Sequence, residues 1–555
     1  MVPSVYEDGT LYNVLPSGNK APDETGNHNG YDQTRADFTF SRGSNLAATR
    51  VNANGLIEKG RENLLLQSNQ FDTTWLNSNS NETSGYSGYD GSNDAWLLTK
   101  SAANGMIYQS ITSSGVQTLS VYAKEGTNSW MQIYAVGSTN VRAYYNLSNG
   151  TLGAYALNVI DRNIEDIGSG WYRCSVTFNS SLTSIRFFVS DGNNNDGGTS
   201  GSIYIQNAQL EYGLAASSYL DSGATTATAG VLENTPRIDY SSGAGALLLE
   251  SQRTNTISKS EYISSYSSGG GAGLTMTANY GISPEGVKNS TRIQYTSGNS
   301  YVYSNYATAT ASGQSFTISI YAKGVAGEQI RLHASGSSGI SFNKEFTLSG
   351  EWQRFDATGT TGSAGQVLPH ILVGYGSSNP ATDFEVYGWQ CEQASHVSSY
   401  VPTYGSAATR GAESGVSDVD SLLTSNATYT WFVEFIVPES GIGGGEITFK
   451  DAGGSSQLRI YCNQNNTIGL RVEDGGQTHF INVSVGDTAK CLFQCSNGLV
   501  KGFYNGSLVH TFTVDTGMDA QKIHLGPPIS APDVKEVLLF NEALSDAECV
   551  TLTTL

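Results

Sequence analysis

The sequence has few charged residues and little proline. Asp, Glu, Lys and Arg make up 14% of its 555 residues and proline occurs 12 times, whereas glycine occurs 64 times and tyrosine 31 times. This composition is typical of many short strands joined by Gly, Ser and Asn turns, and not of a disordered chain. Because a typical domain has about 150 residues, we expect roughly three to four β-rich domains instead of one large core.

Cysteine and long apolar runs are also scarce. The six cysteines are too widely spaced for a disulfide scaffold and form no C-x-x-C pair, so we expect buried thiols. A bridge between Cys491 and Cys495 stays open if neighbouring strands bring them together. The N-terminus lacks the cationic and apolar regions of a signal peptide, and no segment approaches the ~20 apolar residues that span a bilayer. We therefore expect a soluble protein without membrane insertion.

Basic residues are fewer than acidic residues in this sequence. The 29 Lys and Arg residues against 49 Asp and Glu residues give a formal net charge of -20, which repels nucleic-acid phosphates. The sequence also lacks a G-x-S-x-G elbow, an H-E-x-x-H zinc motif and a Gly-Lys-Ser phosphate loop. We therefore expect no nucleic-acid partner and no nucleophilic or nucleotide chemistry.

An internal repeat is the most informative feature that is present. Matching landmarks are Trp171, Gln209 and Tyr219 in one copy and Trp352, Gln390 and Tyr400 in the other, each pair separated by 181 positions. A constant offset over this length indicates two copies of one structural unit. Each copy is long enough to bury its own core.

Alternating apolar residues predict strands within each copy. Leu119, Val121 and Ala123 fall on one face of the first copy, and Ile318, Ile320 and Ala322 do so in the second. With Gly- and Asn-rich turns between such strands, the pattern favours a two-sheet antiparallel sandwich of jelly-roll type. Further strands are predicted after residue 428, with a hairpin at 505–506.

The two copies resemble the carbohydrate-binding-module-like sandwiches of predicted phage tail and fibre proteins. Segments like 236–240 and 246–255 open such a unit and a tract like 390–403 closes it, although the first copy lacks the Pro-Arg-Ile-Asp-Tyr element. Residues 418–555 resemble a concanavalin A-like, laminin-G-type sandwich, whose last strand and helical tail match 534–548. The resemblance implies a bacteriophage virion structural protein, a tail or head fibre, assembled in the host bacterial cytoplasm and displayed on the exterior of the particle. It also implies a homo-oligomer, a trimer by analogy, attached to other virion proteins through its N-terminal segment.

The predicted fold is all-β, with tandem antiparallel β-sandwich domains, a concanavalin A-like sandwich and an extended N-terminal arm. The boundaries are 1–60 for the attachment arm, 61–226 for the first sandwich, 227–236 for a linker, 237–411 for the second sandwich and 412–555 for the concanavalin A-like domain.

Sugar binding is the molecular function that these residues favour. Aromatic faces stack on pyranose C–H surfaces while polar side chains bond the hydroxyls. The candidates for carbohydrate binding are Trp130, Tyr134, Tyr144, Tyr301, Tyr303, Tyr461 and Tyr504. The matched Trp171 and Trp352, and Trp431 in an apolar strand, are instead expected to be core or sheet-packing residues.

Catalysis finds little support in the sequence. Glycosidases need two carboxylates about 5 to 10 Å apart, whereas Glu211 and Glu392 are equivalent residues of separate copies and are expected to be structural. Glu434 could pair with Glu446 or Glu536 as in a glucanase, but the catalytic E-x-D-x-x-E motif of glucanases is absent from the sequence. We therefore expect no enzyme, and a polysaccharide depolymerase is an outside alternative.

Two acidic loops are candidate sites for a structural metal ion. Asp90 and Asp94, and Asp191 and Asp196, lie in turns that hold either a structural Ca²⁺ or only water, and no other cofactor is expected. Two functions therefore remain: an adhesin that presents its sandwiches to host-surface glycans, and a non-adhesive capsid or tail decoration or spacer protein.

Overall fold

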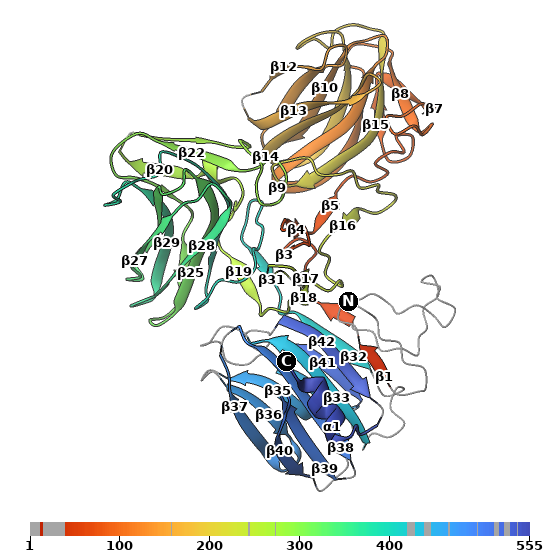
Figure 1. Cartoon of the computed structure of the whole chain (residues 1–555). Coiled ribbons are helices and arrows are strands. Elements are labelled where there is room, and N and C mark those ends of the chain that lie inside the picture. Colours follow the sequence, from red (N-terminus) through yellow and green to blue (C-terminus); the bar gives the residue numbers. More distant parts are fainter. Residues whose placement is uncertain are drawn as a thin grey trace.

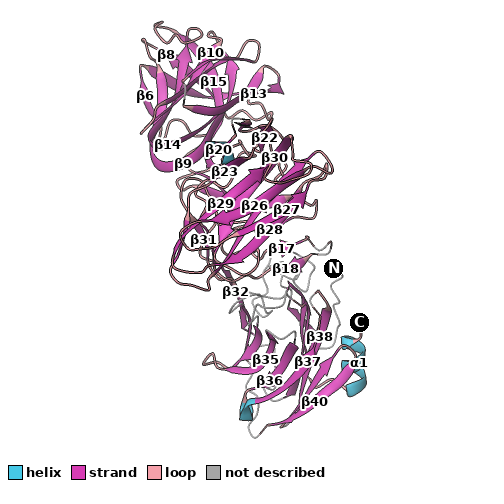
Figure 2. Ribbon diagram, turned by 90° about the vertical axis from the view of Figure 1, so that its left-hand side faces the viewer, coloured by secondary structure: helices cyan, strands magenta, loops and turns pink. Residues whose placement is uncertain are grey.

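A computed structural model describes residues 11–14, 39–156, 158–241, 243, 245–271, 273–418, 428–437, 446–463, 467–484, 486–496, 498–514, 521–526, 533–540 and 542–555. These residues form three β-sandwiches that meet at a central junction (Figure 1), and Figure 2 shows the three sandwiches one above the other. The described part contains one α-helix, α1 (Asp546–Thr553). The predicted all-β fold of tandem antiparallel sandwiches is therefore confirmed. No described helix is long and apolar enough to cross a membrane.

The first sandwich is built on two 20-residue strands that run through both of its layers. Its strands are β6 (Leu76–Ser78), β7 (Ser80–Tyr86), β8 (Ala95–Lys100), β9 (Met106–Glu125), β10 (Trp130–Gly137), β11 (Val141–Asn146), β12 (Thr151–Tyr155), β13 (Val159–Gly168), β14 (Trp171–Ser190) and β15 (Gly201–Tyr212). One layer has the order β12-β11-β10-β14-β9, with β6 at its edge, and the other has the order β13-β14-β9-β15-β8-β7. The predicted inward residues of β9, namely Leu119, Val121 and Ala123, are fully buried between the layers.

The second sandwich consists of two separate antiparallel sheets. One sheet contains β20 (Ser267–Gly270), β23 (Ser300–Tyr303), β24 (Ala307–Ala309), β26 (Gln329–Ser335), β27 (Phe342–Thr347) and β29 (Gly365–Val373). The other contains β21 (Leu274–Thr277), β22 (Thr291–Tyr295), β25 (Ser315–Gly324), β28 (Gln353–Thr360) and β30 (Asp383–Glu392). The 3-10 turn η1 (Ile263–Ser265) precedes them. Ile318, Ile320 and Ala322 lie in the core between the sheets, as their alternation predicts.

The third sandwich packs two further sheets. One has the order β17 (Ile238–Asp239), β18 (Ala246–Leu247), β42 (Asp533–Phe540), β33 (Thr428–Ile436), β38 (Thr488–Ser496), β39 (Leu499–Tyr504) and β40 (Ser507–Thr513), and β1 (Leu11–Val14) also pairs with β42. The other has the order β2 (Thr39–Ser41), β32 (Ser414–Asp418), β41 (Lys522–Gly526), β34 (Glu446–Lys450), β35 (Ser456–Asn463), β36 (Thr467–Val472) and β37 (Gln477–Asn482), with the 3-10 turn η3 (Asp474–Gly476) before β37. The predicted hairpin is present, since Asn505 and Gly506 adopt φ values of 41° and 81° between β39 and β40.

Segments from three parts of the sequence complete this third sandwich. Strands β1 and β2, which fall in the range predicted for the N-terminal attachment arm, pair with β42 and β32. Strand β18, in the range predicted for the second sandwich, also pairs with β42. Sequence periodicity does not show these pairings because the partners lie about 290 to 530 positions apart and register is set by the assembled sheet.

In each of the first two sandwiches, the short strand where the chain enters the domain pairs with the short strand where the chain leaves it. Strand β5 (Arg61–Asn63) pairs with β16 (Ala227–Ala229), and β19 (Arg253–Asn255) pairs with β31 (Ala408–Arg410). The amide Nδ2 of Asn63 donates to two carbonyl oxygens of its sandwich at 3.1 and 2.9 Å, and Asn255 does the same at 3.2 and 2.9 Å. The repeat seen in the sequence therefore includes the strands that join each sandwich to the junction.

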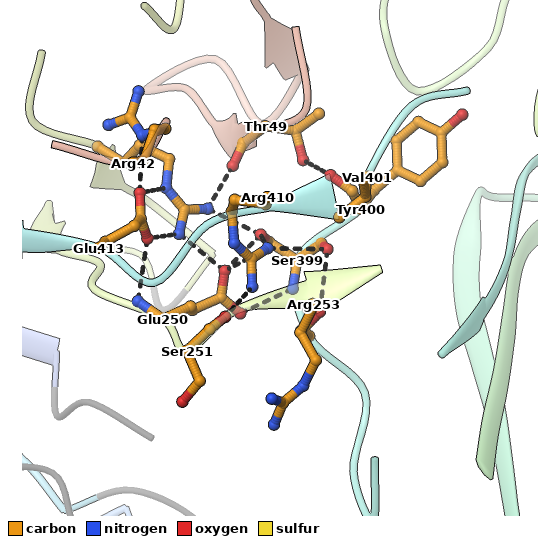
Figure 3. Close-up of polar contacts among 12 residues, drawn as sticks. Arg42, Thr49, Glu250, Ser251, Arg253, Ser399, Tyr400, Val401, Arg410 and Glu413 are labelled. Carbon is orange, nitrogen blue, oxygen red and sulfur yellow. Dashed lines mark hydrogen bonds and ion pairs between the residues drawn. The ribbon is translucent and has the colours of Figure 1, made fainter. Parts of the chain in front are cut away.

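A buried cluster of charges holds the junction together (Figure 3). Arg237 donates through Nε to Oε1 of Glu413 at 2.7 Å and through Nη2 to Glu250 at 2.8 Å. Arg42 donates to Glu413 at 2.8 Å, and Arg410 pairs with Glu250 at 2.9 Å. Although burial opposes ionisation, Arg410 and Arg237 hold the pKa of Glu250 well below its usual range. Three arginines and two glutamates thus connect the N-terminal segment with both ends of the second sandwich.

A second buried charge cluster fixes the hairpin of β3 (Thr49–Val51) and β4 (Ile57–Lys59) to the second sandwich. The ammonium of Lys59 lies 2.9 Å from Glu261 and 3.0 Å from Glu285, and Tyr387 donates to Glu285 at 3.0 Å. Burial lowers the pKa of Lys59, but the two carboxylates raise it well above the usual value. Residues 39–59 are therefore an integral part of the junction.

Several side chains have the structural roles that the sequence predicts. All six cysteines are free and buried, so Cys491 and Cys495 form no bridge. Trp171 and Trp431 are buried, whereas Trp352 is half-buried and donates through Nε1 to the carbonyl oxygen of Ile282 at 3.0 Å. The buried carboxylates of Glu211 and Glu392 each accept the backbone N–H of a following serine at 2.9 Å and so clasp the closing loop of their sandwich.

Candidate glycan-binding face

One outer sheet face of the first sandwich carries the sequence-predicted aromatic residues of that copy. Along β10, Met131, Ile133 and Ala135 point into the core, so Trp130, Gln132 and Tyr134 point outward. On the neighbouring β11, Tyr144 lies directly opposite Gln132. The structure thus brings Trp130, Tyr134 and Tyr144 onto one face.

A cross-strand row crosses the middle of this face, which we call face 1. Tyr134 of β10 lies between Arg142 of β11 and Arg186 of β14, and Tyr108 of β9 follows on the far side of Arg186. The guanidinium carbon of Arg186 lies 5.7 Å from the ring centre of Tyr134 and 5.9 Å from that of Tyr108, within cation–π range. Leu76, which is 53% exposed, ends the row at β6.

A folded loop fixes the neighbouring row of face 1. Asp196 accepts a hydrogen bond from the hydroxyl of Tyr144 at 2.8 Å, from Nε2 of Gln132 at 2.8 Å and from the hydroxyl of Ser190 at 2.6 Å. Burial and the carboxylate of Asp196 together raise the pKa of Tyr144 well above its usual value, so Tyr144 is a hydrogen-bond donor at neutral pH. Asp196, proposed from the sequence as a metal ligand, therefore positions two side chains of face 1.

Trp130 closes the end of face 1. A Cβ atom on Gly153 of β12 would lie 2.6 Å from the Trp130 ring and 2.9 Å from Cβ of Tyr144, so a larger residue there would displace the ring. The backbone N–H of Ala154 donates to the side chain of Asn193 at 2.6 Å, which ties β12 to the Asp196 loop. The half-buried Trp130 ring is thus held in place by its neighbours.

The other predicted metal ligands have protein partners. Asp90 accepts from Ser92 at 2.6 Å, and Asp94 accepts from Gln206 at 2.6 Å and from Asn69 at 2.9 Å. Asp191 pairs with Lys100 at 2.6 Å. No group of three or more His, Cys, Asp or Glu side chains suited to a metal ion occurs in the described part of the chain.

The corresponding face of the second sandwich, face 2, has a row at the same sheet position. His370 of β29 lies opposite both Tyr303 of β23 and His333 of β26, as Arg186 lies opposite Tyr108 and Tyr134. The His370 ring centre is 6.2 Å from Tyr303, 5.7 Å from Tyr301 and 5.2 Å from His333. Burial, and to a lesser degree His333, lowers the pKa of His370 to about 4, so its ring is neutral at pH 7. The sequence-proposed candidates Tyr301 and Tyr303 therefore lie together on face 2, with ring centres 5.9 Å apart.

The arginine of face 2 is neutralised within the protein. Arg331 of β26 pairs with Glu345 of β27 at 2.6 Å, and Ser377 donates to the same carboxylate oxygen at 2.9 Å. Face 2 thus offers aromatic rings, the neutral imidazole of His370 and the ring of His333, whereas face 1 offers aromatic rings and guanidinium groups.

The candidates in the third sandwich are not grouped. Tyr504 packs against the core, and its burial raises its pKa to about 12. Tyr461 lies on β35, on the outer side of the other sheet, 6.3 Å from the exposed ring of Phe480. Tyr461 and Tyr504 lie on β35 and β39 of different sheets, so these two do not form one face.

No family model matches the sequence, and no curated protein does. Solved structures match parts of the fold. The CBM40 of the Ruminococcus gnavus IT-sialidase bound to α2,3-sialyllactose matches at 15% identity and a TM-score of 0.21, over 25% of this chain and 91% of that chain. Domain 4 of AbnA, a GH43 extracellular arabinanase from Geobacillus stearothermophilus in complex with arabinotriose, matches at 18% identity and a TM-score of 0.21, over 26% of this chain and 73% of that chain. The assignment of the fold rests on the strand pairing described above.

Sequence reasoning missed the residues that complete the two faces. Arg142, Arg186 and Tyr108 of face 1 are not among the predicted residues, nor are His333 and His370 of face 2. One signal was available for part of the set: Tyr134 and His333 are 199 positions apart, as are the matched Tyr122 and Tyr321 of the repeat. The cross-strand partners Arg186 and His370 require the sheet register.

A cavity of about 460 Å³ lies away from both faces, where the first two sandwiches meet the junction. Its lining includes Tyr212, Lys259 and Tyr404, and the rings of Tyr212 and Tyr404 stack with centres 5.6 Å apart. The backbone N–H of Val116 donates to the carbonyl oxygen of Tyr404 at 2.5 Å, so this region is a domain contact.

Proposed function

We propose that this chain is a non-catalytic glycan-binding protein that holds sugars on faces 1 and 2. The observation that supports this best is the row of half-buried aromatic side chains at the same sheet position in both sandwiches. Such rings stack on the C–H surface of a sugar ring, and the guanidinium groups of Arg142 and Arg186 beside them can donate to sugar hydroxyls.

Two faces in one chain support adhesion to a surface that carries many glycans. Single open faces bind sugars weakly, but linking two sites raises the overall avidity when both engage at once. The buried junction holds the first two sandwiches together, so the second site stays near a surface that the first has bound.

The absence of catalysis is part of the proposal. Among the predicted acid pairs, Glu434 and Glu536 lie opposite each other on β33 and β42, and burial, together with Glu434, raises the pKa of Glu536. However, Glu434 lies 3.7 Å from Lys490 and 3.9 Å from Lys535, which favours a surface ion-pair network over an acid and base pair. A polysaccharide depolymerase is therefore not favoured.

We also propose that the protein is a bacteriophage virion appendage, displayed on the exterior of the particle as a homo-oligomer. The tandem sandwiches and their order along the chain support this setting. Mass spectrometry of purified particles and light scattering of the purified protein test it, and a mass near three chains is expected.

A non-adhesive spacer is the second candidate function, which the charged junction between the sandwiches favours.

Glycan-array binding followed by titration calorimetry tests adhesion. We expect Tyr134→Ala to weaken binding to face 1 about five- to thirtyfold, in the range of an aromatic hot spot. Tyr280→Ala, which removes a 43% exposed tyrosine in the connection between β21 and β22 of the second sandwich, serves as the control. If no glycan binds, adhesion is contradicted and the non-adhesive spacer is the function that remains.

A further inference from the structure

We propose that face 1 selects acidic glycans by placing a sugar carboxylate between Arg142 and Arg186, with the sugar ring on Tyr134. This inference rests on the proposed function and adds the chemical class of the ligand. It follows from the charges on face 1, from the matching row of face 2 and from the overall charge of the chain.

Arg186 is held in a fixed position without a carboxylate partner. Its guanidinium lies between the rings of Tyr134 and Tyr108, and its Nε makes a long contact of 3.4 Å with the hydroxyl of Ser184. Within the described residues, no Asp or Glu oxygen lies within 4.0 Å of it. A guanidinium fixed in this way retains donors for a bidentate bond to a carboxylate.

Arg142 supplies a second cation on the other side of Tyr134. It is exposed, lies directly opposite Tyr134 on β11, and also forms no ion pair among the residues that the structure describes. Neighbouring strands are about 4.8 Å apart, so the backbones of Arg142 and Arg186 are roughly 10 Å apart, with the backbone of Tyr134 between them. A sugar on the Tyr134 ring thus has a guanidinium on either side.

The carboxylate of Asp196, which lies at face 1, is already occupied. Asp196 accepts hydrogen bonds from Tyr144, Gln132 and Ser190, in the row next to that of the arginines. The middle row of face 1 is therefore cationic, in a chain whose formal net charge is -20. Two unpaired arginines in such a chain indicate that an external anion is their partner.

Face 2 provides an internal comparison. Asn343 stands where Arg142 stands in face 1, opposite His333, and His370 stands in the place of Arg186. The remaining cation, Arg331, is paired with Glu345. Among the residues that the structure describes, face 2 therefore presents no unpaired arginine, which suits a neutral sugar.

The test uses the full-length protein at pH 7 with matched probe pairs. These are oligogalacturonate and its methyl ester, and 3′-sialyllactose and lactose, together with a wider array of neutral and acidic glycans. We expect the acidic member of a pair to bind at least tenfold more tightly, and about tenfold more weakly in 500 mM than in 50 mM NaCl, because exposed charges are screened.

Variants separate charge from structure. Arg142→Gln changes an exposed residue and is expected to lower acidic-glycan affinity about tenfold, and Arg186→Gln by more, whereas Arg186→Lys keeps the charge and retains part of the affinity. Arg292→Gln, on the second sandwich, removes a positive charge elsewhere and is the control. Thermal unfolding of each variant shows whether the fold is kept.

The outcomes distinguish this inference from the proposed function. If neutral glycans bind and neither arginine variant affects them, the proposed function stands and the preference for acidic sugars is overturned. If no glycan of any charge binds, both fail. A loss caused equally by Arg292→Gln would also overturn the inference, because the effect would then be one of net charge.

Discussion

The guanidinium of Arg237 donates through Nε to Oε1 of Glu413 at 2.7 Å, although 176 positions separate the two residues. Arg237 precedes the second sandwich and Glu413 follows it, so this buried pair holds the two ends of the sandwich against each other. Arg42 reaches the same carboxylate from the N-terminal segment. The arrangement of the sandwiches thus depends on very few side chains.

Glu413→Gln is expected to open the junction. The substitution leaves Arg42 and Arg237 buried without their shared carboxylate, and breaking such a pair costs about 3 to 5 kcal/mol. Faster hydrogen exchange in β31 and a larger radius of gyration by X-ray scattering measure the effect. The matched control is Glu58→Gln, whose partner Arg50 is partly exposed, with an expected cost below about 1 kcal/mol. Equal effects of the two variants would contradict the role given to Glu413.

Acid is expected to open the same junction only at low pH. Arg410 and Arg237 overcome the effect of burial and depress the pKa of Glu250 in the folded state. A depressed carboxylate stabilises the fold fully above its unfolded pKa of about 4.3, and this stability is lost as the pH falls through the folded pKa. Scattering profiles at pH 7 and pH 5 should therefore coincide, and expansion should appear only well below pH 4. Expansion already at pH 5 would show that other groups control the junction.

Much of the fold could be predicted because the evidence is local. The two-residue period places Leu119, Val121 and Ala123 in the core and therefore fixes which side of their strand faces outward. The same period puts Trp130 and Tyr134 on one outer face. The repeat then locates the corresponding strands of the second sandwich.

The rest could not be predicted because it depends on long-range register. Arg186 and Tyr134 are opposite each other only in one alignment of β10 and β14, and a slip of one residue would point Arg186 into the core. Asp196 likewise belongs to a loop that folds back over the sheet to reach side chains of β10, β11 and β14, whereas its local sequence shows only an acidic turn. The pairing of β1 with β42 joins segments at opposite ends of the chain.

Asp196→Asn is expected to weaken glycan binding at face 1 without unfolding the sandwich. The carboxylate accepts three hydrogen bonds that hold Tyr144 and Gln132, and bonds to a charged acceptor contribute about 1.5 to 3 kcal/mol each. An amide cannot accept all three, so we expect a three- to tenfold loss of affinity by calorimetry. Asp221→Asn, which changes an exposed carboxylate beside Tyr219, is the control. Unchanged affinity of Asp196→Asn would show that the loop does not position face 1.

His370 is expected to make the second sandwich sensitive to mild acid. Burial lowers its folded-state pKa to about 4, against about 6.5 in the unfolded chain. Its contribution to stability is therefore complete above pH 6.5 and is lost as the pH falls through about 4, by up to about 3 kcal/mol. His370→Gln removes this titration, so its unfolding midpoint should change less between pH 7 and pH 4.5 than that of the wild type. His524, whose pKa burial also lowers to about 4, lies in the third sandwich and remains in both proteins as an internal reference. If the variant keeps the full acid sensitivity of the wild type, His370 is not the group that causes it, and the depressed pKa given to this buried imidazole would be contradicted.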